Sequence, residues 1–142
     1  MAKSQNQKLK LLYIIKILQE HSDEEHPITT KTLIEKLETY GIVAERKSIY
    51  DDMACLEQFG YDIICKKSKT DGGYFLGERM FELAELKLLV DAVQASKFIT
   101  LKKSQTLIKK LETLVSHYDA SKLQRQVYVA NRIKTINESI FY

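Results

Sequence analysis

The stretch Glu45-Arg-Lys-Ser-Ile-Tyr-Asp-Asp-Met-Ala-Cys-Leu-Glu-Gln-Phe-Gly60 decides how this chain is expected to fold. Its apolar residues Ile49, Met53 and Leu56 recur at the spacing of one helical face, and the closing glycine is typical of a helix end. The opposite face carries cations in its first turn and the small Ala54 in its middle. A helix that enters the DNA major groove has such a face, because cations meet phosphate and guanine and small residues let the groove floor come close. Taken alone, the stretch fits an ordinary amphipathic helix better, so its neighbours decide.

A second short helix is predicted just before this one. Thr29 or Thr30 suits the N-cap position in front of a run of apolar residues, and Gly41 suits the position after the last turn. Two short helices joined by a glycine-containing turn form a helix-turn-helix unit, in which residues 46–59 are the second helix. An earlier helix over residues 7–21 is expected to pack across both.

A basic β-hairpin is predicted after the second helix. Tyr61, Ile63 and Cys65 alternate with their neighbours at the period of a strand, and a second short strand follows two glycines. Lysines fill the loop between them, so residues 66–72 form a basic wing. Solubility alone would explain such lysines. The order helix, turn, helix, basic hairpin favours a winged helix whose wing touches the DNA backbone or the minor groove.

The second half of the chain predicts a helical hairpin. The segment 79–99 is apolar on so broad an arc that it needs two partners. A link over 100–103 leads to a helix over 104–117. Its inward stripe is expected to carry Leu107, Leu111, Leu114 and Tyr118, flanked by Ile108 and Val115. Asp119 is expected to cap one more short helix through residue 126.

The predicted fold class is therefore mainly α with a small β-hairpin, a winged helix-turn-helix followed by a helical hairpin. Residues 1–78 form the DNA-binding domain, and residues 79–126 form the hairpin and dimerisation region. Residues 127–142 are expected to form a linker toward a missing C-terminal domain, because the apolar end Ile140-Phe141-Tyr142 is typical of a chain cut from something longer.

Composition limits the classes of protein that fit. The chain has 142 residues, 44% hydrophobic and 29% charged, with a net charge of +3. It has no apolar run of membrane-spanning length and no signal peptide, so a cytoplasmic location and no membrane contact are expected. Its two cysteines are expected to be reduced and partly buried. The charge is informative mainly in its distribution, because four lysines lie along the first helix: Lys3, Lys8, Lys10 and Lys16.

Enzymatic activity is not expected. The three histidines are far apart in sequence, and the chain has no glycine-rich phosphate loop, nucleophile elbow or zinc signature. Asp51 and Asp52 point in directions about 100° apart on a helix. Asp51 is expected to pair with Lys47, and Asp52 to orient a neighbouring helix. No catalytic residue, metal ligand or cofactor is predicted.

The alternative to a DNA-binding protein is a winged helix that binds another protein and no DNA. The basic wing and the cationic first turn argue against it, because an interaction surface more often exposes an apolar patch.

The residues predicted to contact DNA lie on the helix-turn-helix and on the wing. Lys47 is expected to read bases, and Arg46 to reach a phosphate or a guanine. The wing lysines are expected to supply general affinity, since a flexible ammonium follows the backbone without a bidentate pattern. The full predicted set is Thr30, Lys31, Arg46, Lys47, Ser48, Tyr50, Asp51, Ala54, Lys66, Lys67 and Lys69.

Three motifs resemble the N-terminal region of bacterial WYL-domain transcriptional regulators, which begin with a winged helix of the DeoR or biotin-repressor type. They are Pro27-Ile-Thr-Thr-Lys-Thr-Leu-Ile34, Glu45-Arg-Lys-Ser-Ile-Tyr-Asp-Asp52 and Gly73-Tyr-Phe-Leu76. The stretch Phe81-Glu-Leu-Ala-Glu-Leu-Lys-Leu-Leu-Val-Asp-Ala-Val93 is similar to the helix that follows the wing in that family. The resemblance implies a sequence-specific regulator that binds double-stranded DNA as a homodimer. Since no WYL domain is present, any effector ligand is expected only on the missing C-terminal domain.

Overall fold

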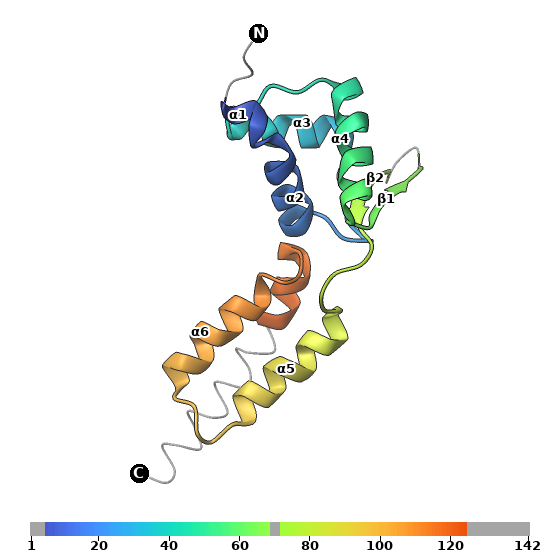
Figure 1. Ribbon diagram of the computed structural model, residues 1–142. Coiled ribbons are helices and arrows are strands. Elements are labelled where there is room, and N and C mark those ends of the chain that lie inside the picture. Colours follow the sequence, from blue (N-terminus) through green and yellow to red (C-terminus); the bar gives the residue numbers. More distant parts are fainter. Residues whose placement is uncertain (1–4, 69–71, 125–142) are drawn as a thin grey trace. The chain divides into compact units, whose positions relative to one another are not determined.

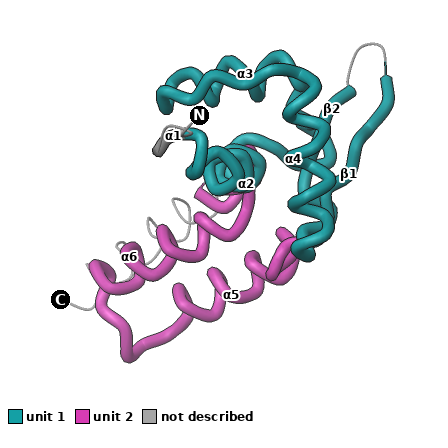
Figure 2. The backbone as a smooth tube through the Cα atoms, turned by 45° about the horizontal axis from the view of Figure 1, so that its top comes forward, with its two compact units in different colours: residues 1–78 teal, residues 79–142 magenta. Residues whose placement is uncertain are grey.

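The computed structural model describes residues 5–68 and 72–124, and the chain divides into two compact units, Met1–Glu78 and Arg79–Tyr142 (Figure 2). The predicted fold class is confirmed: a winged helix-turn-helix is followed by a helical hairpin. In chain order the elements are α1 (Gln5–Lys8), α2 (Lys10–His21), α3 (Thr30–Thr39), α4 (Arg46–Phe59), β1 (Ile63–Lys66), β2 (Gly73–Leu76), α5 (Leu83–Ala95) and α6 (Leu101–Glu112) (Figure 1).

The helix-turn-helix is made by α3 and α4, and its ends follow the capping residues in the sequence. The Thr29 hydroxyl accepts a hydrogen bond from the Thr32 amide at 3.1 Å and so caps α3. Gly41 (φ 77°) ends the turn after α3, and Gly60 (φ 131°) ends α4. Both glycines adopt backbone angles that other residues rarely tolerate, which is why the two helices stop where predicted.

The core of the first unit lies between α2 and the two helices of the helix-turn-helix. Helix α2 packs against α3 and β2, α3 packs against α4, and α4 packs against β1. Because α2 is enclosed on more than one side, its apolar arc is broad. The most deeply buried apolar side chains are Ile14, Ile17, Leu18, Leu33, Leu37, Ile42 and Ile49.

A short strand-like segment before α3 ties the wing to the helices. The Ile28 amide donates to the Tyr74 carbonyl at 2.8 Å, and the Tyr74 amide donates to the Ile28 carbonyl at 2.7 Å. The neighbouring Gly73 has a φ of 152°, and a Cβ there would lie 2.4 Å from the Ile28 carbonyl oxygen. Glycine is therefore required where the two backbones meet.

The wing pairs β1 with β2 in antiparallel register, with Cys65 opposite Tyr74. The period of two predicted Cys65 to point inward, but only Ile63 of β1 is buried. Strand β1 pairs with β2 alone and runs past the core, so its outer residues remain in solvent. Cys55 is also exposed, and both thiols are free. The prediction of partly buried thiols is therefore wrong.

The second unit is built on α5 and α6, which pack against each other. Helix α5 is shorter than the predicted 79–99. It begins after Glu82, whose amide donates to the Glu85 carboxylate at 2.9 Å, in a capping-box arrangement. It ends at Ala95, where Ser96 adopts an extended backbone.

Two further helices of this unit begin at caps that the sequence analysis placed elsewhere. The Thr100 hydroxyl accepts from the Lys103 amide at 3.2 Å, so α6 starts at Leu101 rather than at residue 104 and ends at Glu112 rather than at 117. The Ser116 hydroxyl accepts from the Asp119 amide at 3.2 Å, so Ser116 and not Asp119 caps the helical segment 117–124. Its predicted end at residue 126 lies outside the described residues, as does the predicted linker 127–142.

The core of the second unit is centred on the predicted flank of the stripe, and of the stripe itself Leu111 and Leu114 pack against it while Leu107 and Tyr118 are exposed. Ile108 and Val115 are almost fully buried, whereas Leu107 is 38% exposed. The remaining buried members are Leu86, Val90, Ala120 and Leu123. Every helix in the described part of the chain is too short or too polar to span a lipid bilayer.

Candidate nucleic-acid interface

Helix α4 turns one polar face to solvent. Ile49, Met53 and Leu56 are buried in the core of the first unit. On the other side, four of the residues predicted to contact DNA are exposed together with Tyr50, which is 49% exposed: Arg46, Lys47, Asp51 and Ala54. The face therefore combines two cations, one phenol, one carboxylate and a small residue at its middle.

One ion pair fixes the rotation of this face. The Lys10 ammonium lies 2.7 Å from the Asp52 carboxylate, and the two side chains are only 10% and 21% exposed. The same ammonium donates to the Ser48 hydroxyl at 2.9 Å. Helix α2 therefore contacts α4 at Ser48 and Asp52, which lie one helical turn apart on the side that faces away from solvent. Asp52 orients a neighbouring helix, as its place at the edge of the apolar stripe suggested.

The lysines of the first helix are less available to an anion than their number suggested. Lys10 is buried and paired inside the unit. Lys16 pairs with Glu20 at 3.0 Å, and that hydrogen bond raises the pKa of Lys16. Lys8 is exposed, and Lys3 lies outside the described residues.

Ser48 belongs to the cap of α4. Its hydroxyl donates to the Glu45 carbonyl at 2.8 Å and accepts from the Glu45 amide at 3.3 Å, in addition to its bond with Lys10. A hydroxyl with three hydrogen-bond partners inside the protein has little capacity left to bind a ligand. Unlike the other predicted residues of α4, Ser48 is turned toward the protein.

The ion pair predicted between Asp51 and Lys47 is absent from the described residues, whose ion pairs and hydrogen bonds do not join these two side chains. Both side chains are exposed. In water the attraction of such a pair is comparable to the rotamer entropy that pairing costs, so the i, i+4 spacing alone does not hold it together. Lys47 is consequently free to reach a ligand.

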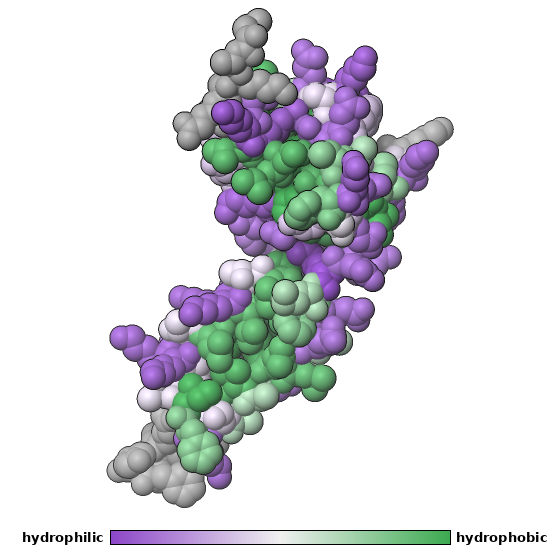
Figure 3. Space-filling view, viewed as in Figure 1, coloured by the Kyte–Doolittle hydropathy of each residue, from purple (hydrophilic) through white to green (hydrophobic). Residues whose placement is uncertain are grey.

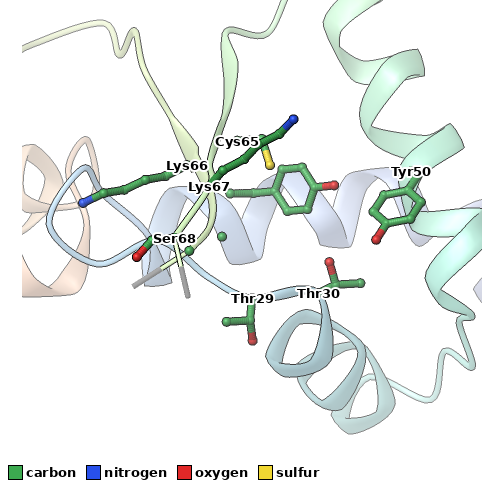
Figure 4. Close-up of a pocket in the computed structure, with 10 residues that line it drawn as sticks. Thr29, Thr30, Tyr50, Cys65, Lys66, Lys67 and Ser68 are labelled. Atoms are coloured by element: carbon green, nitrogen blue, oxygen red, sulfur yellow. The ribbon is translucent and has the colours of Figure 1, made fainter. Parts of the chain in front are cut away.

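A depression of about 390 Å³ lies where α3, α4 and the wing meet (Figure 4). We call it the notch. Thr30 is the first residue of α3, Tyr50 projects from α4, and Lys66 and Lys67 come from the end of β1. Lys31 is exposed but does not line the notch, and Lys69 lies outside the described residues. The full lining is Thr29, Thr30, Tyr50, Cys65, Lys66, Lys67, Ser68, Gly72, Gly73 and Tyr74.

The lining of the notch favours an anion. It contains two lysines and several hydroxyls, and none of its described residues is a carboxylate. Burial raises the pKa of the Tyr74 phenol, the Cys65 thiol and Tyr50 phenol raise it further, and a hydrogen bond with Thr30 acts in the opposite direction. Tyr74 is therefore a neutral hydroxyl at physiological pH. Groups that donate hydrogen bonds, together with ammonium groups, suit phosphate oxygens.

Sequence reasoning found Thr30, Tyr50, Lys66 and Lys67 but missed Tyr74 in this site. Tyr74 reaches the notch because it lies opposite Cys65 in the strand register and pairs with Ile28. Neither contact leaves a signal in the sequence before the register is known.

In the described part of the chain, no three metal-binding side chains lie together.

Residues 12–68 match the family model described as the D3 domain of FokI, a DNA-binding-related domain. The match runs from α2 through both helices of the helix-turn-helix and the first strand of the wing. No curated protein and no solved structure matches the chain. The helix-turn-helix of this chain and the elements around it are thus similar to a DNA-binding-related domain.

Proposed function

We propose that this chain binds double-stranded DNA, with α4 in the major groove and the wing on the phosphate backbone or in the minor groove. The carrying observation is the solvent face of α4, on which Arg46 and Lys47 are exposed together with Tyr50, and Tyr50 also lines the notch with its two lysines. The similarity of residues 12–68 to the D3 domain of FokI supports the proposal.

The proposal assigns different tasks to the helix and the wing. Lys47 points away from the buried stripe and has no ion-pair partner in the described part of the chain, so it can reach a base edge. Arg46 can bind a guanine or a phosphate from the first turn. Lys66 and Lys67 provide charge along the backbone, which raises affinity for all sequences.

We further propose that the protein is a sequence-specific transcriptional regulator of the WYL type and has no catalytic role. The resemblance of its motifs to that family supports this assignment, in which the effector binds to a C-terminal domain outside this chain.

The same proposal includes a homodimer formed through the second unit. Apolar side chains gather over the α5–α6 hairpin (Figure 3), and Leu88 and Phe98 are 71% and 100% exposed. A two-fold dimer would place two α4 helices on a symmetric operator. Sedimentation velocity over a range of concentrations should show a dimer that the Leu88→Glu variant weakens. A monomer at high micromolar concentration would contradict it.

The test of DNA binding is selection of bound duplexes from a random pool, followed by anisotropy titrations of the enriched duplex at several salt concentrations. One enriched motif is expected, and log affinity should fall with log salt by about 0.9 per phosphate contact. An absence of binding at low salt, or a flat salt response, would remove the proposal. The winged helix would then be better explained as a protein-interaction module.

A further inference from the structure

We infer that the notch holds one phosphate group of the DNA backbone, and that Tyr50 contacts this phosphate rather than a base. The inference rests on the proposed DNA binding and deepens it. Tyr50 lies on the helix that is proposed to read bases, so its place on that helix alone would assign it to base reading. Its surroundings assign it to the backbone.

The position of Tyr50 around α4 is the first argument. At about 100° per residue, Lys47, Asp51 and Ala54 lie within about 60° of one another on the helix surface, and Tyr50 lies about 60° from Lys47, on the side toward Arg46. That side is the one on which Tyr50 lines the notch. Tyr50 therefore lies between Ala54 and Arg46 on the solvent face, on the side that borders α3 and the wing.

The hydroxyl groups around the notch are the second argument. Figure 4 shows the side chains of Tyr50 and Thr30 facing each other across the depression, one from α4 and one from the start of α3. Tyr50 is 49% exposed, so its hydroxyl is open to a ligand. Thr30 also shares a hydrogen bond with Tyr74, and where the neutral Tyr74 phenol donates in that bond, the Thr30 hydroxyl keeps its own proton. Tyr50 and Thr30 can then donate to two oxygens of the same phosphate, a geometry that carries no base information.

The charge of the lining is the third argument. The ammonium groups of Lys66 and Lys67 end on different sides of the same β1 terminus in Figure 4. Either can swing toward an anion in the notch, because a lysine has a flexible four-carbon stem. None of the described residues that line the depression is a carboxylate, and Glu57, which lies outside the lining, is the weakest of the groups that raise the pKa of Tyr74. Base edges present donors as well as acceptors, whereas every free oxygen of a phosphodiester accepts, as this lining requires.

The test uses Tyr50→Phe, which removes one hydroxyl and keeps the ring, with Tyr118→Phe as the matched control. Tyr118 is 45% exposed and lies in the other unit. Affinities are measured on the selected duplex, on a library of its single-base changes and at several salt concentrations. The Tyr50→Phe protein should bind every duplex about tenfold more weakly, the effect of one hydrogen bond to a charged group. Its base preferences and its salt slope should stay the same, because the lost group is neutral.

A second arm identifies the phosphate. Each backbone phosphate of the duplex is replaced in turn by an uncharged methylphosphonate. At one position the losses from the methylphosphonate and from Tyr50→Phe should be non-additive, whereas elsewhere they should add. Thr30→Val should show non-additive losses at the same position. Unfolding midpoints close to that of the wild type would show that the variants fold.

Three results would overturn the inference and leave DNA binding in place. They are additive losses at every phosphate, a changed preference of Tyr50→Phe at one base pair, and an affinity equal to that of the Tyr118→Phe control. Inorganic phosphate and a mononucleotide serve as competitors. If either binds in a Tyr50-dependent way at a concentration where duplex does not, the notch is a site for small phosphate compounds and the backbone assignment is wrong. If the wild type binds no duplex at all, the proposed function fails as well.

Discussion

The Lys10 ammonium of α2 lies 2.7 Å from the Asp52 carboxylate of α4. A buried ion pair adds little net stability, because two charges leave water to form it, but it penalises arrangements in which one partner is left alone. Here the pair acts together with Ser48, one turn earlier on α4. Its effect is to select one rotation of α4, the rotation that leaves Lys47 and Tyr50 on the outside.

Lys10→Met should destabilise the first unit by roughly 2–4 kcal/mol, because it leaves the Asp52 carboxylate without its partner. The loss is limited because Asp52 is 21% exposed and so keeps some contact with water. Lys16→Met is the matched control, because Lys16 is on the same helix but its pair with Glu20 is on the surface. Urea denaturation of both variants measures the difference. Equal losses would show that the pair with Asp52 has no special role.

Gly73→Ala should weaken the link between the wing and α3. The new Cβ would lie 2.4 Å from the Ile28 carbonyl oxygen at a φ of 152°, so the strand pair must move apart. We expect a loss of several kcal/mol, about 1–3 of it from backbone strain alone. Gly60→Ala has a similar strain at φ 131° but no atom within 4 Å of the new Cβ. Urea denaturation should therefore show the larger loss for Gly73→Ala, and equal losses would mean that the contact with Ile28 does not matter.

Lys47→Ala and Lys67→Ala should affect DNA binding in different ways. Loss of a base contact by Lys47 should cost roughly 1–3 kcal/mol and relax preference at one base position. Loss of Lys67 should weaken all sequences alike and lower the salt slope by about 1. Lys109→Ala, on α6 of the other unit, is the control. If the Lys67 variant reshapes the binding profile and the Lys47 variant only scales it, the two roles are reversed.

Asp51→Ala should change base preference less than Lys47→Ala does. The carboxylate forms no ion pair with Lys47 in the described residues, so its loss leaves the position of that lysine unchanged. Removing a negative charge beside phosphate should strengthen binding to all sequences. The same library of single-base changes measures this, and a loss of preference at one base pair would instead show that Asp51 accepts a hydrogen bond from a base.

Tyr74 should make the first unit sensitive to alkaline pH. Burial raises the pKa of this phenol above its ordinary value. Above about pH 10, the unfolded chain releases a proton that the folded chain retains, so stability present below that pH is lost as the pH rises toward the folded pKa. Tyr74→Phe should flatten this fall in urea denaturation between pH 9 and pH 11, whereas Tyr118→Phe should not. The raised pKa of Lys16 acts in the same pH range in both variants and cancels in the comparison.

The helix boundaries of the first unit could be predicted from the sequence because contacts between nearby residues set them. Thr29, Gly41 and Gly60 each set a helix boundary through contacts within one or two turns, so a sequence pattern is sufficient to place them. The same rules applied to Thr100 and Ser116 would have placed the helices of the second unit. There, the apolar pattern does not mark the helix starts, which the capping hydroxyls of Thr100 and Ser116 set instead.

Contacts between distant segments account for what the sequence could not predict. Lysine is usually a surface residue, and Lys10 gains its buried partner Asp52 only because α4 packs close to α2. The notch needs three elements in place before its lining exists. Cys65 was expected inside because strand alternation says which residues share a face, but not which face the core covers.

The pairing of Ile28 with Tyr74 also has a consequence for the order of folding. The two residues are far apart in sequence, so this bridge closes a long loop, and contacts of that kind form late because loop-closure entropy opposes them. Within the helix-turn-helix, α3 and α4 contact each other over a shorter stretch of sequence, whereas the pairing of Lys10 with α4 also closes a long loop. We expect a folding intermediate of the first unit, where one is populated, to hold α3 against α4 before the notch exists. A chain emerging from the ribosome would form this helix pair first, and the notch proposed to hold a phosphate only once the wing has been made.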